Sequence, residues 1–209
     1  DLSKEEYIKI EEWIESTSRD GKRLIGIATL KNSHAGRHIK PEEVTNLEFT
    51  GMLVFYDPIR PEVPNAIKNI ESHGVKMVLV TGDLKGTALS VAKSLNWEVA
   101  ENEILVGSQL KDLSEEELLA ILPSIKIFAR VTPEDKLNIG QLYQKLGEVV
   151  AMTGDGVNDA PALKAMDIGI SLGSGSDVAK SAADLVLLDD NFETISSSID
   201  EGHRILANI

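Results

Sequence analysis

The chain has 209 residues, 42% of them hydrophobic and 26% charged, which is an ordinary composition for a folded globular protein. Its formal net charge of −13 repels nucleic acid and anionic membranes, so neither is expected as a partner. The absence of cysteine excludes disulfides and thiolate metal sites. No apolar run approaches the ~20 residues that a membrane-spanning helix needs, so this chain by itself is expected to be soluble.

The first 57 residues predict one helix and two strands. Ser3 and Glu6 have the spacing of a capping box, and apolar residues then recur at helical intervals as far as the next Asp-Gly pair. Residues 24–30 and 47–56 are apolar runs typical of strands, and the polar stretch between them predicts a loop. A sharp break follows at Asp57, because Pro58 and Pro61 interrupt any regular element there.

After this break, predicted helices and strands alternate. Helices are expected at residues 64–73, 86–95, 114–122, 133–146, 160–166, 177–183 and 192–209, and strands at 75–80, 125–131, 148–152, 168–172 and 185–188. Strands that alternate with helices five times predict a doubly wound α/β sheet with parallel strands. Ligands of such sheets bind beyond the carboxyl ends of the strands.

Thr81, Gly82 and Asp83 directly follow the predicted strand that ends at Val80. The hydroxyl group and the N–H groups after it can donate to a phosphate, and glycine lets a phosphate approach the backbone. A plain turn in which Asp83 caps the next helix explains the same residues. From the tripeptide alone, the plain turn is the favoured interpretation.

A second loop, TGDGVND at 153–159, places Asp155 and Asp159 four residues apart with glycines around them. Two such carboxylates can converge on one hard cation, and Mg²⁺ needs only one or two because it also takes water and phosphate oxygens. Asn158 can hydrogen-bond a phosphoryl oxygen without adding charge. The alternative is a Gly-Asp loop in which Asp159 caps a helix, but a turn of that kind needs neither two acids nor an amide.

Lys136 lies in the first turn of the helix that Thr132 and Pro133 begin. A cation there opposes the helix dipole, which invites a functional account such as pairing with a phosphoryl group or a carboxylate. A solvated lysine on a helix face is the commoner case. The Gly-Ser-Gly-Ser loop at 173–176 could hold an anion, but a flexible turn explains it better, so no function is assigned to it.

Several longer segments extend these loops. They are DPIR at 57–60, VTGD at 80–83, FARVTP at 128–133 leading to Lys136, MTGDGVNDAPAL at 152–163, ADLVLLDDN at 183–191 and EGHR at 201–204. Together they resemble the P-type ATPases of the haloacid dehalogenase superfamily, and the type II cation pumps look nearest. The resemblance spans nearly the whole chain and is strongest from Tyr56 onward.

This resemblance implies a domain organisation. Residues 58–200 are expected to form the phosphorylation domain, with a haloacid dehalogenase-like, Rossmann-like sheet. Residues 1–57 are expected to be a small α+β remnant of the nucleotide-binding domain. Residues 201–209 are expected to begin a stalk toward a membrane helix.

The resemblance also implies site residues. They are the metal ligands Asp155 and Asp159, the phosphate contacts Thr81, Gly82 and Asn158, the catalytic residues Lys136, Asp83, Thr81 and Asp159, and the nucleotide contacts Arg130, Arg23 and Asp57. Lys136, oriented by Asp83, is expected to neutralise the charge of the transferred phosphoryl group. The implied cofactors are Mg²⁺ and ATP, because phosphoryl transfer depends on positioning and charge neutralisation.

The sequence departs from the family pattern at the nucleophile. No Asp-Lys-Thr-Gly-Thr segment is present, and in the superfamily that segment lies on a central strand of the sheet. Strands that flank a missing central strand would have unpaired backbone groups. We therefore expect either a strand from another polypeptide or closure of the gap by new pairing or dimer exchange. Without the nucleophile, the chain alone is expected not to hydrolyse ATP.

The predicted function is the cytosolic part of an ATP-driven cation pump, at the cytosolic face of a membrane. Its expected partners are the rest of the pump: the nucleophile strand, the nucleotide-binding domain and the membrane helices. The alternatives are a non-catalytic regulatory module of the same superfamily that binds Mg²⁺ or nucleotide, and a small-molecule phosphatase, which the missing nucleophile disfavours. Ion selectivity is expected to reside in the membrane helices.

Overall fold

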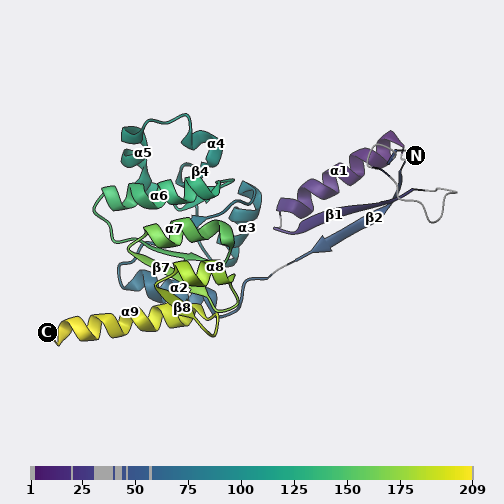
Figure 1. Cartoon of the computed structure of the whole chain (residues 1–209). Coiled ribbons are helices and arrows are strands. Elements are labelled where there is room, and N and C mark those ends of the chain that lie inside the picture. The colour runs from purple at the N-terminus through teal and green to yellow at the C-terminus, as the bar shows by residue number, and fades with distance from the viewer. Residues whose placement is uncertain are drawn as a thin grey trace. The chain divides into compact units, whose positions relative to one another are not determined.

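The computed structural model describes residues 3–19, 21–30, 40, 44–45, 47–56 and 58–208. The chain divides into two compact units, Asp1–Pro58 and Ile59–Ile209 (Figure 1). No helix of the described residues is long and apolar enough to cross a bilayer. The assignment of the first unit to a nucleotide-binding domain, and of residues 201–209 to a stalk, stays a prediction.

The first unit contains the predicted helix and the two predicted strands. These are α1 (Lys4–Arg19), β1 (Arg23–Thr29) and β2 (Glu48–Phe55), and the strands pair antiparallel. The capping box is present, since the Glu6 carboxylate accepts from the Ser3 N–H at 2.8 Å and the Ser3 hydroxyl accepts from the Glu6 N–H at 3.3 Å. Most of the predicted loop at 31–45 lies outside the described residues.

This small sheet leaves large apolar side chains in contact with solvent. Ile25 is 44% exposed, Leu53 47% and Phe55 49%. Two strands and one helix offer too little area to bury a core of their own. These apolar side chains therefore remain exposed within the described residues of this unit.

The second unit is built on parallel strands. They are β3 (Leu79–Val80), β4 (Ile104–Val106), β5 (Ile127–Ala129), β6 (Ala151–Gly154), β7 (Ile168–Leu172) and β8 (Leu185–Leu187). The order is β3-β5-β4 in one sheet and β6-β7-β8 in another, and every pair is parallel. The predicted α/β fold class is confirmed.

Helices connect these strands and cover the sheets (Figure 1). They are α2 (Val63–Ser72), α3 (Lys85–Ser94), α4 (Gly107–Leu110), α5 (Glu115–Ile121), α6 (Pro133–Lys145), α7 (Ala160–Ala165), α8 (Asp177–Ala182) and α9 (Phe192–Ala207). The sequence did not predict β4 and α4, because three strand residues followed by a four-residue helix are too short to show a period.

Four strands of the second unit are edge strands: β3 and β4 flank β5, and β6 and β8 flank β7. Within the described residues, β3 pairs only with β5 and β6 pairs only with β7, so no ladder joins the two sheets. The predicted strand at 75–80 is accordingly reduced to Leu79–Val80, and the strand predicted at 148–152 is shifted to Ala151–Gly154. An apolar run becomes a regular strand only where a neighbour supplies hydrogen bonds.

The core of the second unit is centred on β5. Ile127, Phe128 and Ala129 are all 0% exposed. Phe128 packs on one face of the sheet with residues such as Leu122 and Ile139, whereas Ile127 and Ala129 belong to a separate cluster that includes residues of α3. Successive strand residues point to opposite faces, so this short apolar run fills two layers at once.

The closing helix α9 packs against α2. The amide of Asn69 donates to the buried Ser196 hydroxyl at 2.6 Å, and His73 Nε2 lies 2.7 Å from an oxygen of Asp200. His73 also makes an edge-to-face contact with His203. These contacts hold α9 against α2 between Ser196 and His203, and the helix then extends beyond α2 (Figure 1).

We expect Gly169→Ala to destabilise the second unit. A Cβ at Gly169 in β7 would lie 2.5 Å from the backbone carbonyl oxygen of Leu163 in α7, and a backbone atom cannot move aside easily. The expected cost is about 1–3 kcal/mol, measured by thermal unfolding followed by circular dichroism. Gly202→Ala in α9 is the control, because nothing lies within 4 Å of the added methyl group and alanine favours the helix. Equal midpoints for both variants would contradict this packing.

We also expect alkaline destabilisation that depends on Tyr143. Its hydroxyl donates to the Leu122 carbonyl at 3.0 Å, and burial raises the pKa of Tyr143 from 10.0 to about 12. Because the unfolded chain releases this proton first, the stabilisation is complete below pH 10 and is lost as the pH rises toward 12. In urea titrations from pH 9 to pH 12, Tyr143→Phe should lose less stability than the unsubstituted chain. Parallel pH profiles would disprove this linkage.

Candidate functional site

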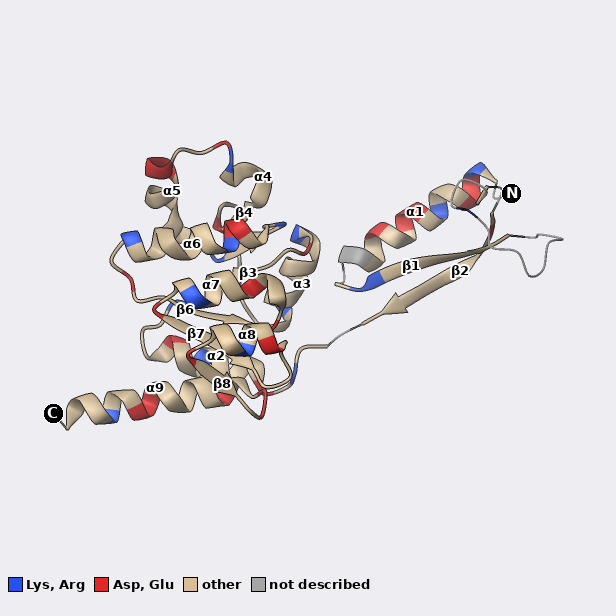
Figure 2. Ribbon diagram, in the orientation of Figure 1, with Lys and Arg blue, Asp and Glu red and all other residues tan. Residues whose placement is uncertain are grey.

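The loops at the carboxyl ends of the strands contain nearly all of the predicted site residues. Thr81 follows β3, Arg130 follows β5, Asp155 follows β6 and Gly173 follows β7. Since the strands of each sheet are parallel, the loops of one sheet emerge at the same edge. The helices α6 and α8 begin directly after these loops, and each carries acidic and basic residues (Figure 2).

The loops after β3 and β5 are joined through their backbones. The Arg130 N–H donates to the Asp83 carbonyl at 2.9 Å, and the Val131 N–H donates to the Thr81 carbonyl at 3.2 Å. The Thr81 hydroxyl accepts from the Asp83 N–H at 3.0 Å and lies 3.1 Å from the Asp83 carboxylate. This tripeptide is therefore a closed turn. Asp83 does not cap α3, whose N-cap is Leu84, so the plain-cap interpretation is wrong.

Arg130 has an uncommon backbone conformation. Its φ is +55°, in the left-handed region that residues other than glycine rarely occupy. Its carbonyl lies so close to Gly107 that a Cβ there would be 2.3 Å from the oxygen. Strain of this kind costs about 1–3 kcal/mol and persists only where the surrounding contacts enforce it. The contacts with Asp83 and Gly107 thus fix the position of the Arg130 backbone, from which the exposed side chain extends.

Lys136 connects the two sheets. The helix α6 begins where the sequence predicts, with the Thr132 hydroxyl accepting from the Asp135 N–H at 3.1 Å. One turn later, Lys136 Nζ lies 2.7 Å from Asp159 Oδ1, with the two side chains only 23% and 14% exposed. In the described residues, Lys136 has no hydrogen bond or ion pair with Asp83. The expected orientation of Lys136 by Asp83 is therefore replaced by pairing with Asp159.

Asp159 holds its own loop as well as the lysine. Its second oxygen accepts from the Gly156 N–H at 3.2 Å, which closes the short 3₁₀ turn Val157–Asp159. Glycine at position 154 allows the Asp159 side chain to approach the backbone closely, because a Cβ there would lie 2.6 Å from Asp159 Cβ. Asp159 is the N-cap residue of α7 by position, but its side chain makes no capping hydrogen bond. Both of its oxygens thus have protein partners.

Asp155 presents a different kind of carboxylate. Its backbone carbonyl accepts from the Ser176 N–H at 2.8 Å, which fixes the loop after β6 against the loop after β7. Its side chain is exposed, and among the described residues its carboxylate has no hydrogen-bond or ion-pair partner. The amide of Asn158 is likewise exposed and unpaired in that part of the chain. Hard oxygen donors on a fixed loop match the preference of Mg²⁺.

The Gly-Ser-Gly-Ser loop is more ordered than the sequence suggests. The Ser176 hydroxyl accepts from the Ala179 N–H and caps α8, and the Ser174 N–H donates to the Asp190 carboxylate at 3.0 Å. This hydrogen bond lowers the pKa of Asp190. Sequence reasoning missed the contribution of Ser176 to the site, although the serine one residue before a predicted helix is a recognisable cap signal.

The predicted nucleotide contacts are only partly placed. Arg130 lies beside the loop that contains Thr81. Arg23 begins β1 in the first unit, opposite Phe55. Asp57 lies outside the described residues. The described residues contain no group of three or more His, Cys, Asp or Glu side chains able to hold a metal.

Comparison with known proteins identifies relatives along the whole chain. The chain is 43% identical to Calcium-transporting ATPase 1 of Saccharomyces cerevisiae, covering 100% of this chain and 22% of that protein. It is 50% identical to a calcium-transporting ATPase of Bacillus subtilis, over 80% of this chain and 19% of that protein. The chain thus spans about a fifth of the length of these relatives.

Solved structures give the same fold. A zinc-transporting PIB-type ATPase in its E2.Pi state superposes with a TM-score of 0.64 and 24% identity, over 95% of this chain and 26% of that one. A family model described as haloacid dehalogenase-like hydrolase matches residues 3–167, and a second with the same description matches residues 137–199. The chain therefore belongs to the haloacid dehalogenase-like hydrolases, and its homologues are calcium-transporting P-type ATPases.

Proposed function

We propose that this chain is the part of an ATP-driven cation pump that binds Mg²⁺ and the transferred phosphoryl group while an aspartyl phosphate forms and is hydrolysed. The observation that carries the proposal is the ion pair between Lys136 and Asp159, which gathers the loops of both sheets around one edge. A lysine, an unpaired carboxylate and a phosphate-binding turn are the groups that phosphoryl transfer needs. The names of the relatives, which transport calcium, support a cation as cargo.

Asp155 is the proposed metal ligand. Its carboxylate is exposed and free of other partners in the described residues, whereas Asp159 is committed to Lys136 and Gly156. Asp159 would therefore act on the metal mainly by fixing the loop. Bound Mg²⁺ would supply charge neutralisation to the phosphoryl oxygens, and it retains several waters when only one or two carboxylates bind it.

The phosphoryl group would bind beside this carboxylate. The Gly82 N–H and the Asn158 amide are proposed donors, and glycine at position 82 leaves room for the approach. The Thr81 hydroxyl, which donates to the Asp83 carboxylate at 3.1 Å, would turn to the phosphoryl group as a further donor. Lys136 would neutralise part of the phosphoryl charge. Its pairing with Asp159 holds the ammonium group in place beforehand, so little reorganisation is needed when the phosphoryl group arrives.

The nucleophile would come from another segment. These 209 residues contain no Asp-Lys-Thr-Gly-Thr sequence, and β3 and β6 both have an unpaired edge in the described residues. We propose that a strand carrying the nucleophilic aspartate pairs between β3 and β6, which would satisfy both edges. The nucleotide would lie near Arg130. The chain alone would be inactive, and it would lie at the cytosolic face of a membrane as part of an integral membrane pump.

A regulatory module that binds Mg²⁺ or nucleotide without catalysis is the alternative. The missing nucleophile favours it, because the remaining groups bind charge but form no covalent intermediate. The two functions differ in one observable. Only the pump component should restore phosphorylation when the missing strand is supplied.

We expect fragment complementation to restore phosphorylation. The chain would be mixed with a polypeptide that carries the Asp-Lys-Thr-Gly-Thr strand and a nucleotide-binding domain, then given labelled ATP and Mg²⁺. Acid-stable, hydroxylamine-sensitive label should appear on the added polypeptide, and Asp155→Asn should reduce its rate of formation by roughly 100-fold. The control is Asp112→Asn, an exposed acid in a turn that is not one of the proposed site residues. Undiminished labelling with Asp155→Asn would refute the metal role, and no labelling at all would favour the regulatory module.

The ion pair should couple the two sheets energetically. In a double-mutant cycle with Lys136→Met and Asp159→Asn, we expect a coupling free energy of about 1–3 kcal/mol in urea unfolding, because both side chains are largely shielded from water. The matched control is the pair of Lys145 and Glu115, also at 2.7 Å but 53% and 58% exposed, where coupling should be about 0.2–1 kcal/mol. Equal coupling in the two cycles would show that the Lys136 pair has no special role.

A further inference from the structure

Two polar contacts join α2 and α9, one helical turn apart on each helix. The Asn69 amide donates to the Ser196 hydroxyl at 2.6 Å, and His73 Nε2 lies 2.7 Å from Asp200 Oδ1. Four positions separate the two residues on each helix, so both contacts lie on the same face of α2 and the same face of α9. The second contact lies close to the point where α9 extends beyond α2 (Figure 1).

Both ring nitrogens of His73 face an acceptor. Nδ1 lies 2.8 Å from the Asn69 carbonyl oxygen, and Nε2 lies 2.7 Å from the Asp200 carboxylate. A carbonyl oxygen and an ionised carboxylate accept hydrogen bonds but cannot donate them. A neutral imidazole has a single N–H and would turn a lone pair toward one of these oxygens, whereas an imidazolium donates to both. The two contacts therefore match the charged form of His73.

The place of His73 on its own helix favours the same form. His73 is the C-cap residue of α2, where the last carbonyls give the helix end a partial negative charge. A cation at this end stabilises the helix, and the last turn of α2 contains no other basic residue. The His73 side chain is 21% exposed and that of Asp200 is 49% exposed, so water screens their pairing incompletely.

The charged neighbours on α9 do not reproduce this effect. Arg204 Nη1 lies 3.1 Å from the Glu201 carboxylate, and arginine and glutamate both stay charged between about pH 6 and about pH 8. The exposed His203 contacts the His73 ring edge to face, with the ring centroids 5.3 Å apart. A charge on His203 would repel a charge on His73, so protonation of His203 would weaken the contact between the helices.

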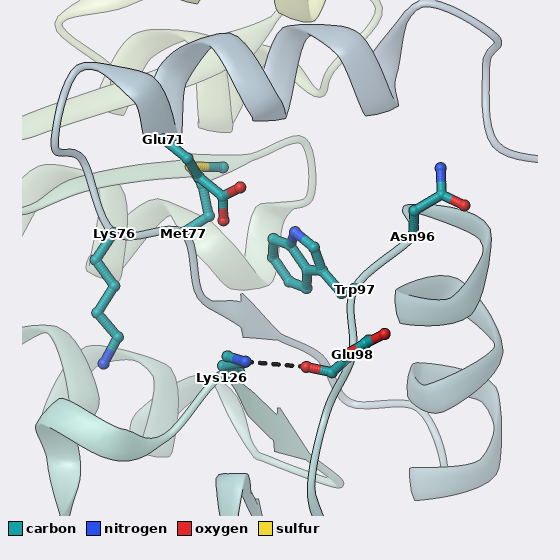
Figure 3. Close-up of a pocket in the computed structure, with 7 residues that line it drawn as sticks. All are labelled: Glu71, Lys76, Met77, Asn96, Trp97, Glu98 and Lys126. Atoms are coloured by element: carbon teal, nitrogen blue, oxygen red, sulfur yellow. Dashed lines mark hydrogen bonds between the residues drawn. The ribbon is translucent and has the colours of Figure 1, made fainter.

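The charged residues of α2 and of the segment after it are directed elsewhere. Lys68 and Glu71 lie five and two positions before His73, and neither spacing brings helix side chains together. Glu71 instead lines a pocket with residues of other segments (Figure 3). Lys76 donates to the Leu122 carbonyl at 3.1 Å. Asp200 is therefore the charged side chain that pairs with the His73 ring in the part of the chain that the structure describes.

We propose that His73 and Asp200 form a pH-sensitive clasp that governs how firmly α9 is held against α2. While His73 is charged, it donates to both the Asn69 carbonyl and Asp200, and the clasp is closed. Histidine ordinarily loses its proton near pH 6.5, so the clasp is complete below that pH and weakens as the pH rises through this range. The contact between Asn69 and Ser196 does not titrate, so only the part of α9 from Asp200 onward is released more often.

Hydrogen exchange of the full chain tests the clasp. Mass spectrometry would follow the amides of residues 200–207 at about pH 6 and about pH 8, with each rate corrected for the intrinsic exchange rate at that pH. We expect their protection to fall at least about fivefold at the higher pH, because a charge-assisted hydrogen bond is lost. The amides of α6, which contains no histidine, should keep equal protection. Constant protection of residues 200–207, or an equal fall in α6, would overturn the proposal.

Three variants separate His73 from other effects of pH. His73→Gln removes the titrating ring, and Asp200→Asn provides an amide that can accept from Nε2 or donate to it. Each should reduce the fall in protection of residues 200–207 to less than about twofold. His203→Gln is the matched control, because it leaves both hydrogen bonds of His73 in place and should preserve the fall. A full fall in His73→Gln, or its loss in His203→Gln, would refute the clasp, and circular dichroism would establish that the variants fold.

Discussion

The ion pair between Lys136 and Asp159 is the interaction on which the arrangement of the site depends. It connects the loop after β5 with the loop after β6, and these strands belong to separate sheets. Because the two side chains are largely withdrawn from water, loss of either partner would leave a poorly solvated charge. The second oxygen of Asp159 orders the backbone at Gly156, which in turn fixes the loop that contains Asp155. One carboxylate is thus used to position the loop, and the other remains available to a cation.

The unpaired edges of β3 and β6 give the second unit its other main feature. Parallel strands are normally buried on both faces and paired on both sides, but these two are paired on one side only in the described residues. Helices and the ion pair hold the two sheets together instead. A strand inserted between them would satisfy their backbone groups and would bring its own carboxyl end to the loops that contain Thr81 and Asp155.

The charged groups beyond the carboxyl ends of the strands differ in their partners. Lys136, which follows β5, is paired with Asp159, whereas the carboxylate of Asp155, which follows β6, has no partner in the described residues. The buried strand β5, with Ile127, Phe128 and Ala129 fully enclosed, is the fixed support from which the segment with Arg130 and Lys136 extends.

The sequence by itself determined most of the local elements and the loops in which the candidate site residues lie. The helix caps at Ser3, Ser114 and Thr132 each join two residues that are three positions apart, so they can be recognised in the sequence. The strand β7 lies where its apolar run predicts. Only the tertiary structure decided which groups meet across long separations in the sequence. Lys136 pairs with Asp159 and not with Asp83, and the left-handed backbone of Arg130 packs against Gly107. The length of β3, which is only two residues, was also decided by its neighbour in the sheet. The physical reason is that hydrogen-bond ladders and ion pairs depend on neighbours brought close by folding. A residue's own segment specifies what it can bind but not which partner lies within reach.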